Sequence, residues 1–230
     1  MNAFDEQFSK IENLSPSKEK TKLIESMFHS SIWNQLDTNQ KIRLLELLEI
    51  DFADQENRKP NKIEVWQKLP FIACASFPFS NSIKISKHHL ETMGTKSNAK
   101  FYCAIKHEHE HFNQYYDSIS TKKDSKTEEM RINLNSLIPY SGKTATKYIE
   151  YRLQPTEYYA HKISEEKTKE VFERLITEFG PDEGYEKWDQ EEVVPLDLLV
   201  QLYNEENNTN FSFEELYQKI FSSLTEKYQK

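Results

Sequence analysis

The chain has few of the residues on which several common kinds of protein depend. Its 230 residues include only 4 glycines and two cysteines, Cys74 and Cys103. Glycine supplies the positive φ angles of tight hairpins and phosphate-binding loops, so its scarcity favours helices joined by short polar loops. Two cysteines cannot form a disulfide framework. The sequence therefore predicts a helix-rich protein that is held together without disulfide bonds.

Excess basic charge and long apolar runs are also missing. The 30 Lys and Arg residues are outnumbered by 38 Asp and Glu residues, giving a net charge of -8, whereas a nucleic-acid binder needs a basic surface. No apolar run approaches the roughly 18 residues of a membrane span, and residues 1–6 lack the basic and apolar parts of a signal peptide. We expect a soluble, cytoplasmic protein with no nucleic-acid or membrane partner. Nothing in the sequence indicates the oligomeric state.

Apolar and aromatic residues are present in amounts that suffice for a core. Hydrophobic residues make up 37% of the chain and aromatic residues 13%, which argues against wholesale disorder. Changes in composition predict three segments packed as one compact unit. These are a helical segment over residues 1–57, a core over residues 58–180 and a second helical segment over residues 181–230.

Signals for helix ends recur along the chain. Helix starts are predicted at Ser15-Pro16, at the capping-box pairs Asp37 with Gln40 and Ser212 with Glu215, and at Pro155, and Gly180 is predicted to end a long helix. Residues 98–116 also have helical spacing, whereas the polar stretch 118–129 predicts an exposed loop. Helix is therefore expected over most of the chain.

Short strands are predicted in one region only. Residues 63–66, 71–77 and 82–86 are rich in β-type residues and are separated by proline and asparagine. The third run alternates polar and apolar residues, as a half-buried strand does. The expected fold class is therefore α+β, mostly helical with a small mixed sheet.

One motif carries chemistry. His107, Glu108 and His111 match the pattern H-E-x-x-H. Residues four apart lie on one face of a helix, so the two imidazoles can bind one ion. The glutamate beside the first histidine can act as a general base on a metal-activated water. The motif predicts a Zn²⁺ site, which needs a third protein ligand and an open position to be catalytic.

The helical wheel supports a buried motif. At about 100° per residue, His107, Glu108 and His111 fall beside the apolar residues of the same helix. Burying such polar groups is costly unless they have partners, and a metal ion supplies one. His109 and Glu110 fall at the edge of this face or opposite it, so we expect both to be solvated.

The third ligand is expected from a later helix. Glu157 and His161 lie four residues apart after Pro155, and the small Ala160 between them would allow a second helix to approach closely. Glu157 is the better candidate for a site with two histidines and one carboxylate. His161 could replace it, or could stabilise a developing oxyanion. Tyr158 is a further candidate for oxyanion stabilisation. Cys103, one turn before His107, could be a ligand, but we expect it to be a packed thiol.

These residues together resemble a known group of enzymes. H-E-x-x-H at residues 107–111, followed by E-x-x-A at residues 157–160, resembles the gluzincin type of zinc metallopeptidase. With Gln114, Arg152, Gln154 and Pro155 added, the pattern is similar to uncharacterised zincin-like proteins of Gram-positive bacteria and their mobile elements. The resemblance covers residues 58 to 160.

The resemblance implies both a site and a fold. It implies that His107, His111 and Glu157 bind zinc, and that Glu108 is the general base. It also implies a small sheet packed on the helix that carries the motif, with an edge strand that could pair with a peptide or protein substrate. The expected function is that of a zinc metallopeptidase. The alternatives are a zinc-stabilised binding or regulatory module without turnover, and a zinc amidase for non-peptide substrates.

Overall fold

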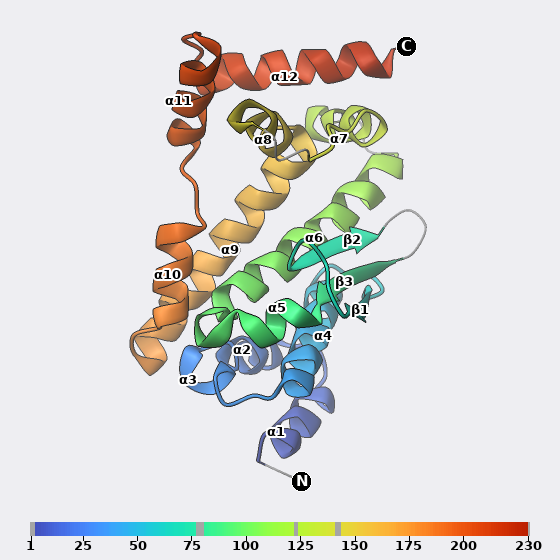
Figure 1. Ribbon diagram of the computed structural model, residues 1–230. Helices are drawn as coiled ribbons and strands as arrows, with labels where there is room; N and C mark the ends of the chain where they lie inside the picture. Colours follow the sequence, from blue (N-terminus) through green and yellow to red (C-terminus); the bar gives the residue numbers. More distant parts are fainter. Residues whose placement is uncertain (1–2, 77–80, 122–123, 141–143, 230) are drawn as a thin grey trace. The chain divides into compact units, whose positions relative to one another are not determined.

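The computed structural model describes residues 3–76, 81–121, 124–140 and 144–229. Helices dominate (Figure 1), which confirms the predicted mostly helical α+β class. The helices are α1 (Ala3–Glu12), α2 (Lys18–Ser26), α3 (Ser30–Trp33), α4 (Thr38–Gln55), α5 (Lys87–Thr92), the 3₁₀ turn η1 (Gly94–Lys96), α6 (Asn98–Ile119), α7 (Ser125–Asn135), α8 (Ala145–Arg152), α9 (Pro155–Phe179), α10 (Glu183–Glu191), α11 (Leu196–Asn207) and α12 (Phe213–Tyr228). Within the described residues, none of these helices has both the length and the apolar character needed to cross a lipid bilayer.

Several predicted helix ends are confirmed. Both capping boxes form, at the start of α4 and at the start of α12. Gly180 follows α9 with a φ of 96°, which a residue with a side chain rarely adopts. The first predicted start is displaced, because Ser17 rather than Ser15 caps α2. The predicted loop over residues 118–129 is largely wrong: α6 continues to Ile119 and α7 begins at Ser125, and residues 122–123 lie outside the described part.

The sheet contains the three predicted strands, β1 (Lys62–Trp66), β2 (Ala73–Ser76) and β3 (Ser82–Ser86). β3 lies in the middle, parallel to β1 and antiparallel to β2. β2 begins two residues after the predicted start at residue 71, and the predicted end at Phe77 lies outside the described residues. Ile83 and Ile85 of β3 are fully buried, as a central strand requires. The mixed sheet is therefore confirmed.

The chain divides into two compact units. Unit 1 comprises Met1–Phe112 and Ile163–Glu192, and unit 2 comprises Asn113–Lys162 and Val193–Lys230. The boundaries predicted after residues 57 and 180 do not separate these units. The reason is that α6 and α9 are long, continuous helices, and each contributes residues to both units.

The core of unit 1 is largely aromatic. Phe28 stacks on Trp33 at a centroid distance of 5.5 Å and meets the edge of Tyr102 at 5.2 Å. Tyr102 also meets Phe52 and Phe172, at 5.9 and 6.0 Å. These rings connect α3 and the turn before it with α4, α6 and α9. Much of the apolar surface that stabilises unit 1 is therefore buried around the first half of α6.

A buried group of hydrogen bonds links the starts of three helices in unit 1. The Nδ2 of Asn98 donates to the carbonyl of Phe28 at 2.8 Å and to both carboxylate oxygens of Asp182 at 3.0 Å. Asp182 in turn accepts from the backbone of Ser30 and caps α10 through the backbone of Gly184. One buried carboxylate thus orients the starts of α3, α6 and α10.

Gly184→Ala is expected to destabilise unit 1 by about 1–3 kcal/mol because an added Cβ would lie 1.8 Å from the Oδ1 of Asn98. At an ordinary helix position the same change stabilises a protein by up to about 1 kcal/mol, so the sign of the effect is diagnostic. Urea unfolding measures it, with Lys187→Ala on the exposed surface of α10 as the control. A stabilised Gly184→Ala protein would contradict the packing described here.

The core of unit 2 is formed by α7, α8, α11 and α12. Its buried members are Ile132, Ile149, Leu153, Leu199, Val200, Tyr203, Leu216, Ile220 and Leu224. Tyr158 of α9 packs against this cluster. The beginning of α9 is thus anchored to the hydrophobic core of unit 2.

Candidate metal centre

The H-E-x-x-H residues lie on α6, as predicted. The Nε2 atoms of His107 and His111 are 3.1 Å apart, and their ring centroids are 4.6 Å apart. In a tetrahedral site with Zn–N bonds of about 2.0–2.1 Å, two ligand nitrogens lie about 3.3 Å apart. The two imidazoles therefore have the separation that two ligands of one ion require.

The start of α9 is fixed by buried hydrogen bonds within unit 2. The Oδ1 of Asn133 accepts from the backbone nitrogen of Thr156 at 2.8 Å and from its hydroxyl at 2.7 Å. The Nδ2 of Asn133 donates to the Oε1 of Gln154 at 2.9 Å, and the Nε2 of Gln154 donates to the carbonyl of Ile138 at 3.0 Å. These contacts cap the helix immediately before Glu157. Asn133 could not be recognised from the sequence, because it lies in the middle of an ordinary helical stretch.

Two hydrogen bonds align α6 with α9. Toward the start of α6, the Sγ of Cys103 lies 3.6 Å from the Oγ of Ser164. Toward its end, the Nε2 of Gln114 donates to the carbonyl of Thr156 at 2.9 Å. Residue numbers rise along α6 while they fall along α9, so the two helices are antiparallel.

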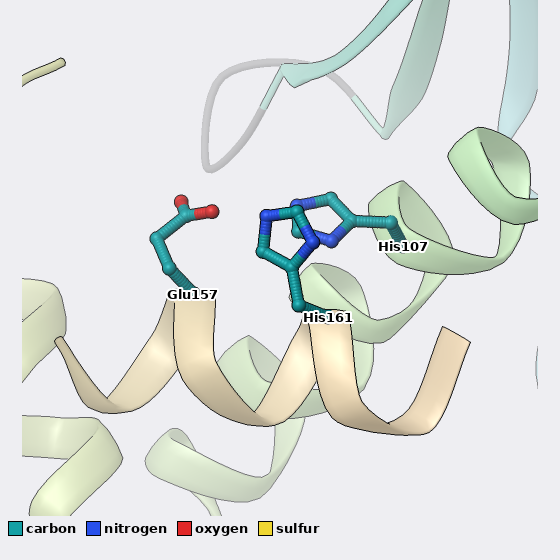
Figure 2. Close-up of side chains that lie close together, drawn as sticks. All are labelled: His107, Glu157 and His161. Atoms are coloured by element: carbon teal, nitrogen blue, oxygen red, sulfur yellow. The ribbon is translucent and has the colours of Figure 1, made fainter. Parts of the chain in front are cut away.

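The structure groups three potential ligands from these two helices. His107, Glu157 and His161 each offer one ligand atom, and these atoms all lie within 4.8 Å of one another. Figure 2 shows the three side chains projecting from their helices into the same space. His107 and Glu157 were predicted ligands, and His161 was the predicted alternative. His111 is not a member of this group, although its Nε2 is close to that of His107.

Cys103, which the sequence left open as a ligand, is not a member either. Its thiol contacts Ser164 instead.

Glu108 follows the first histidine of the motif on α6, and its side chain is half-buried. Burial raises the pKa of the Cys74 thiol on β2, and the negative charge of Glu108 raises it further. The packing of the sheet on the motif helix, which the resemblance implied, stays a prediction.

Tyr158 lies among aromatic side chains. Its ring centroid is 5.1 Å from that of Tyr159, 5.4 Å from that of Phe213 and 5.6 Å from that of Tyr217. Phe213 and Tyr217 belong to α12. These contacts explain Tyr158 as a packing residue of unit 2, and we assign it no part in the chemistry below.

His109 is buried, so the prediction that it is solvated is wrong. Its side chain is fully inaccessible; its Nδ1 lies 2.8 Å from the Oε2 of Glu49, and its Nε2 lies 2.8 Å from the Oε2 of Glu56. The guanidinium of Arg58 contacts the same ring. Glu49 is also fully buried and accepts from the backbone and the side chain of Asn61, at 2.9 and 2.6 Å. A network of charged groups thus joins α6 to the end of α4.

Glu110 is also buried, again contrary to prediction. It is 6% exposed, and its Oε1 lies 2.5 Å from the Nζ of Lys106. Glu56, His109 and Glu110 form a second group with ligand atoms close together. However, Lys106 pairs with Glu110, and Arg58 pairs with Glu56 at 3.2 Å. Cationic side chains of the protein already neutralise these carboxylates, so we interpret this second group as structural.

Comparison with protein-family models, with curated proteins and with solved structures finds no match to this chain.

Proposed function

We propose that this protein is a zinc-dependent hydrolase, and that it cleaves peptide bonds. The observation that carries the proposal is the paired imidazoles of α6: the Nε2 atoms of His107 and His111 lie 3.1 Å apart, and Glu108 follows His107 on the same helix. A metal site and a general base on neighbouring residues are what hydrolysis by an activated water requires.

The residues present fit a zinc ion. Zinc in proteins takes histidine nitrogens and carboxylate oxygens, and a catalytic site commonly has three such ligands. His107 and His111 supply nitrogens at a suitable separation, and Glu157 supplies the carboxylate. Glu157 is only 7% exposed, so a cation beside it would offset the cost of its burial. Harder ions prefer sites made of oxygen ligands only, which makes zinc the better candidate.

The metal ion and Glu108 would have separate roles in hydrolysis. A bound zinc ion would lower the pKa of a water molecule and polarise the carbonyl of the substrate. The carboxylate of Glu108 would accept the proton from the attacking water, and would later donate it to the leaving amine. β2 is an edge strand of the sheet, and an extended peptide substrate would pair with such an edge.

Two alternatives predict different measurements. A zinc-stabilised binding or regulatory module would bind the metal without hydrolysing any substrate. A zinc amidase would hydrolyse small amides but not peptides. Profiling with a peptide library and a panel of non-peptide amides separates these alternatives from a peptidase.

The first test is the metal content. Protein purified without a histidine tag or chelator is expected to contain close to one zinc ion per chain by plasma mass spectrometry, because His107 and His111 are already paired on α6. His107→Ala and Glu157→Ala are expected to lose it. His88→Ala is the matched control, because His88 is an exposed histidine on α5. If the wild-type protein held no metal even after zinc was added, the proposed function would be wrong.

A further inference from the structure

We propose that the outer edge of β1 is a dimerisation surface, and that its partner is β1 of a second copy of this chain. The two strands would pair antiparallel across a twofold axis and join two three-stranded sheets into one continuous sheet. The inference does not depend on the proposed function, because β1 carries none of the residues assigned to the metal site or to the general base.

The backbone at the edge of β1 is the first observation. Within the described residues, β1 pairs with β3 and with no other strand. The backbone nitrogen of Lys62 donates to the carbonyl of Asn81 at 2.9 Å, so alternate residues from Lys62 onward form the ladder with β3. The backbone groups of Ile63 and Val65 therefore point away from the sheet, and such an edge is a template for a further strand.

The side chains at this edge are the second observation. Val65 is 41% exposed and Trp66 is 46% exposed, which leaves two large apolar side chains uncovered at the end of the strand. Proteins commonly protect an edge strand with a proline or a bulge. β1, every residue of which is described, contains no proline, and its register with β3 runs from Lys62 to Trp66 without a bulge. The edge is therefore regular enough to pair.

The charges on β1 indicate what its partner is. Lys62 and Glu64 project from the same face of the strand, and their side chains are 77% and 30% exposed. A charged side chain on an edge strand opposes pairing with most other strands. A second copy of β1 that runs antiparallel brings the same two charges in reverse order. The strand is therefore complementary to itself.

The charges also select one register, which is centred on Ile63. In an antiparallel pair, residues whose backbone groups point outward lie opposite one another, so the choice is among Ile63 and Val65. With Ile63 opposite Ile63, each Lys62 lies opposite Glu64 of the second copy, which gives two ion pairs. With Ile63 opposite Val65, the two Glu64 side chains face each other, and like charges directly opposite are destabilising. With Val65 opposite Val65, Glu64 faces Trp66, and the two charges of β1 are not matched across the strands.

The test is sedimentation velocity of the full chain over a range of concentrations, with chelator present so that metal binding does not contribute. The wild type is expected to form a dimer. Lys62→Glu and Glu64→Lys should each raise the dissociation constant by at least about tenfold, because two ion pairs become two like-charge contacts. The charge swap that combines both changes should restore the dimer. Lys22→Glu, a charge reversal at an exposed position on α2, should match the wild type.

A neutral variant and hydrogen exchange complete the test. Glu64→Gln should weaken a dimer centred on Ile63, whereas it would strengthen a dimer in which two Glu64 side chains face each other. In the wild type, the amide proton of Ile63 should become protected from exchange as the concentration rises, because pairing gives it a hydrogen-bond acceptor. The exchange measurement needs no variant, so it decides the question even if a substituted chain fails to fold.

Every other result overturns the inference. A chain that stays monomeric at all concentrations does not use this edge. A dimer that resists both charge reversals, or that the charge swap does not restore, is formed by another surface, and a dimer strengthened by Glu64→Gln has another register. Exchange at Ile63 that does not change with concentration has the same consequence. The proposed function is unaffected by these results, because it is tested by metal content and by hydrolysis.

Discussion

Replacing Glu108 with glutamine is expected to reduce hydrolysis by about 10²–10⁴-fold, the usual contribution of a general acid–base group. Glutamine has nearly the same shape and occupies the same half-buried position, but it cannot accept the proton of the attacking water. Because Glu108 is not among the grouped ligands, the metal content should stay near that of the wild type. A loss of turnover without a loss of metal separates the base from the ligands.

The measurement combines two readings on each protein. Hydrolysis is followed with a library of quenched fluorescent peptides, and zinc is quantified by plasma mass spectrometry on the same sample. Glu166→Gln is the matched control, since Glu166 is exposed on α9 and should keep full activity. Full activity in Glu108→Gln would exclude the mechanism proposed here. Loss of metal together with activity would instead show that Glu108 supports the site structurally.

The residues proposed to bind the metal could largely be identified from the sequence. His107, His111, Glu157 and His161 form two pairs at helical spacing, and local periodicity is sufficient to place each pair on one helix face. The sequence also indicated that the two helices could approach each other, because Ala160 is small, and the structure buries this residue completely. Periodicity alone could not decide between Glu157 and His161 as the third ligand, because both lie on the same face of α9.

The error at His109 has a different origin. A helical wheel identifies one apolar face and assigns the rest of the helix to water, but α6 also packs on α4. The carboxylates that make burial of His109 possible belong to Glu49 and Glu56, more than fifty positions earlier in the chain. In the sequence, a polar residue on a second buried face of a helix cannot be distinguished from a solvent-exposed one until its partners are known. Asn133, which positions the start of α9, could not be found for the same reason.

Replacing His109 with alanine is expected to lower the free energy of unfolding of unit 1 by about 3–5 kcal/mol. The change leaves Glu49 in a fully buried position without the imidazole that lies 2.8 Å from it. It also removes the ring that packs edge-on against Phe52, with centroids 5.2 Å apart. Urea unfolding followed by tryptophan fluorescence measures the effect, because Trp33, Trp66 and Trp188 all belong to unit 1.

The design of this experiment must separate stability from metal binding, since His109 lies between His107 and His111. Unfolding is therefore measured in the presence of chelator, with exposed His88→Ala as the control, expected within about 0.5 kcal/mol of the wild type. Comparing His109→Ala, Glu49→Gln and the double variant isolates the coupling between the two buried groups. If the single changes are additive, Glu49 and His109 do not stabilise each other. If they are strongly coupled, then α6 is fixed against α4 by the residue in the middle of the motif, and the same contact sets where His107, Glu108 and His111 point.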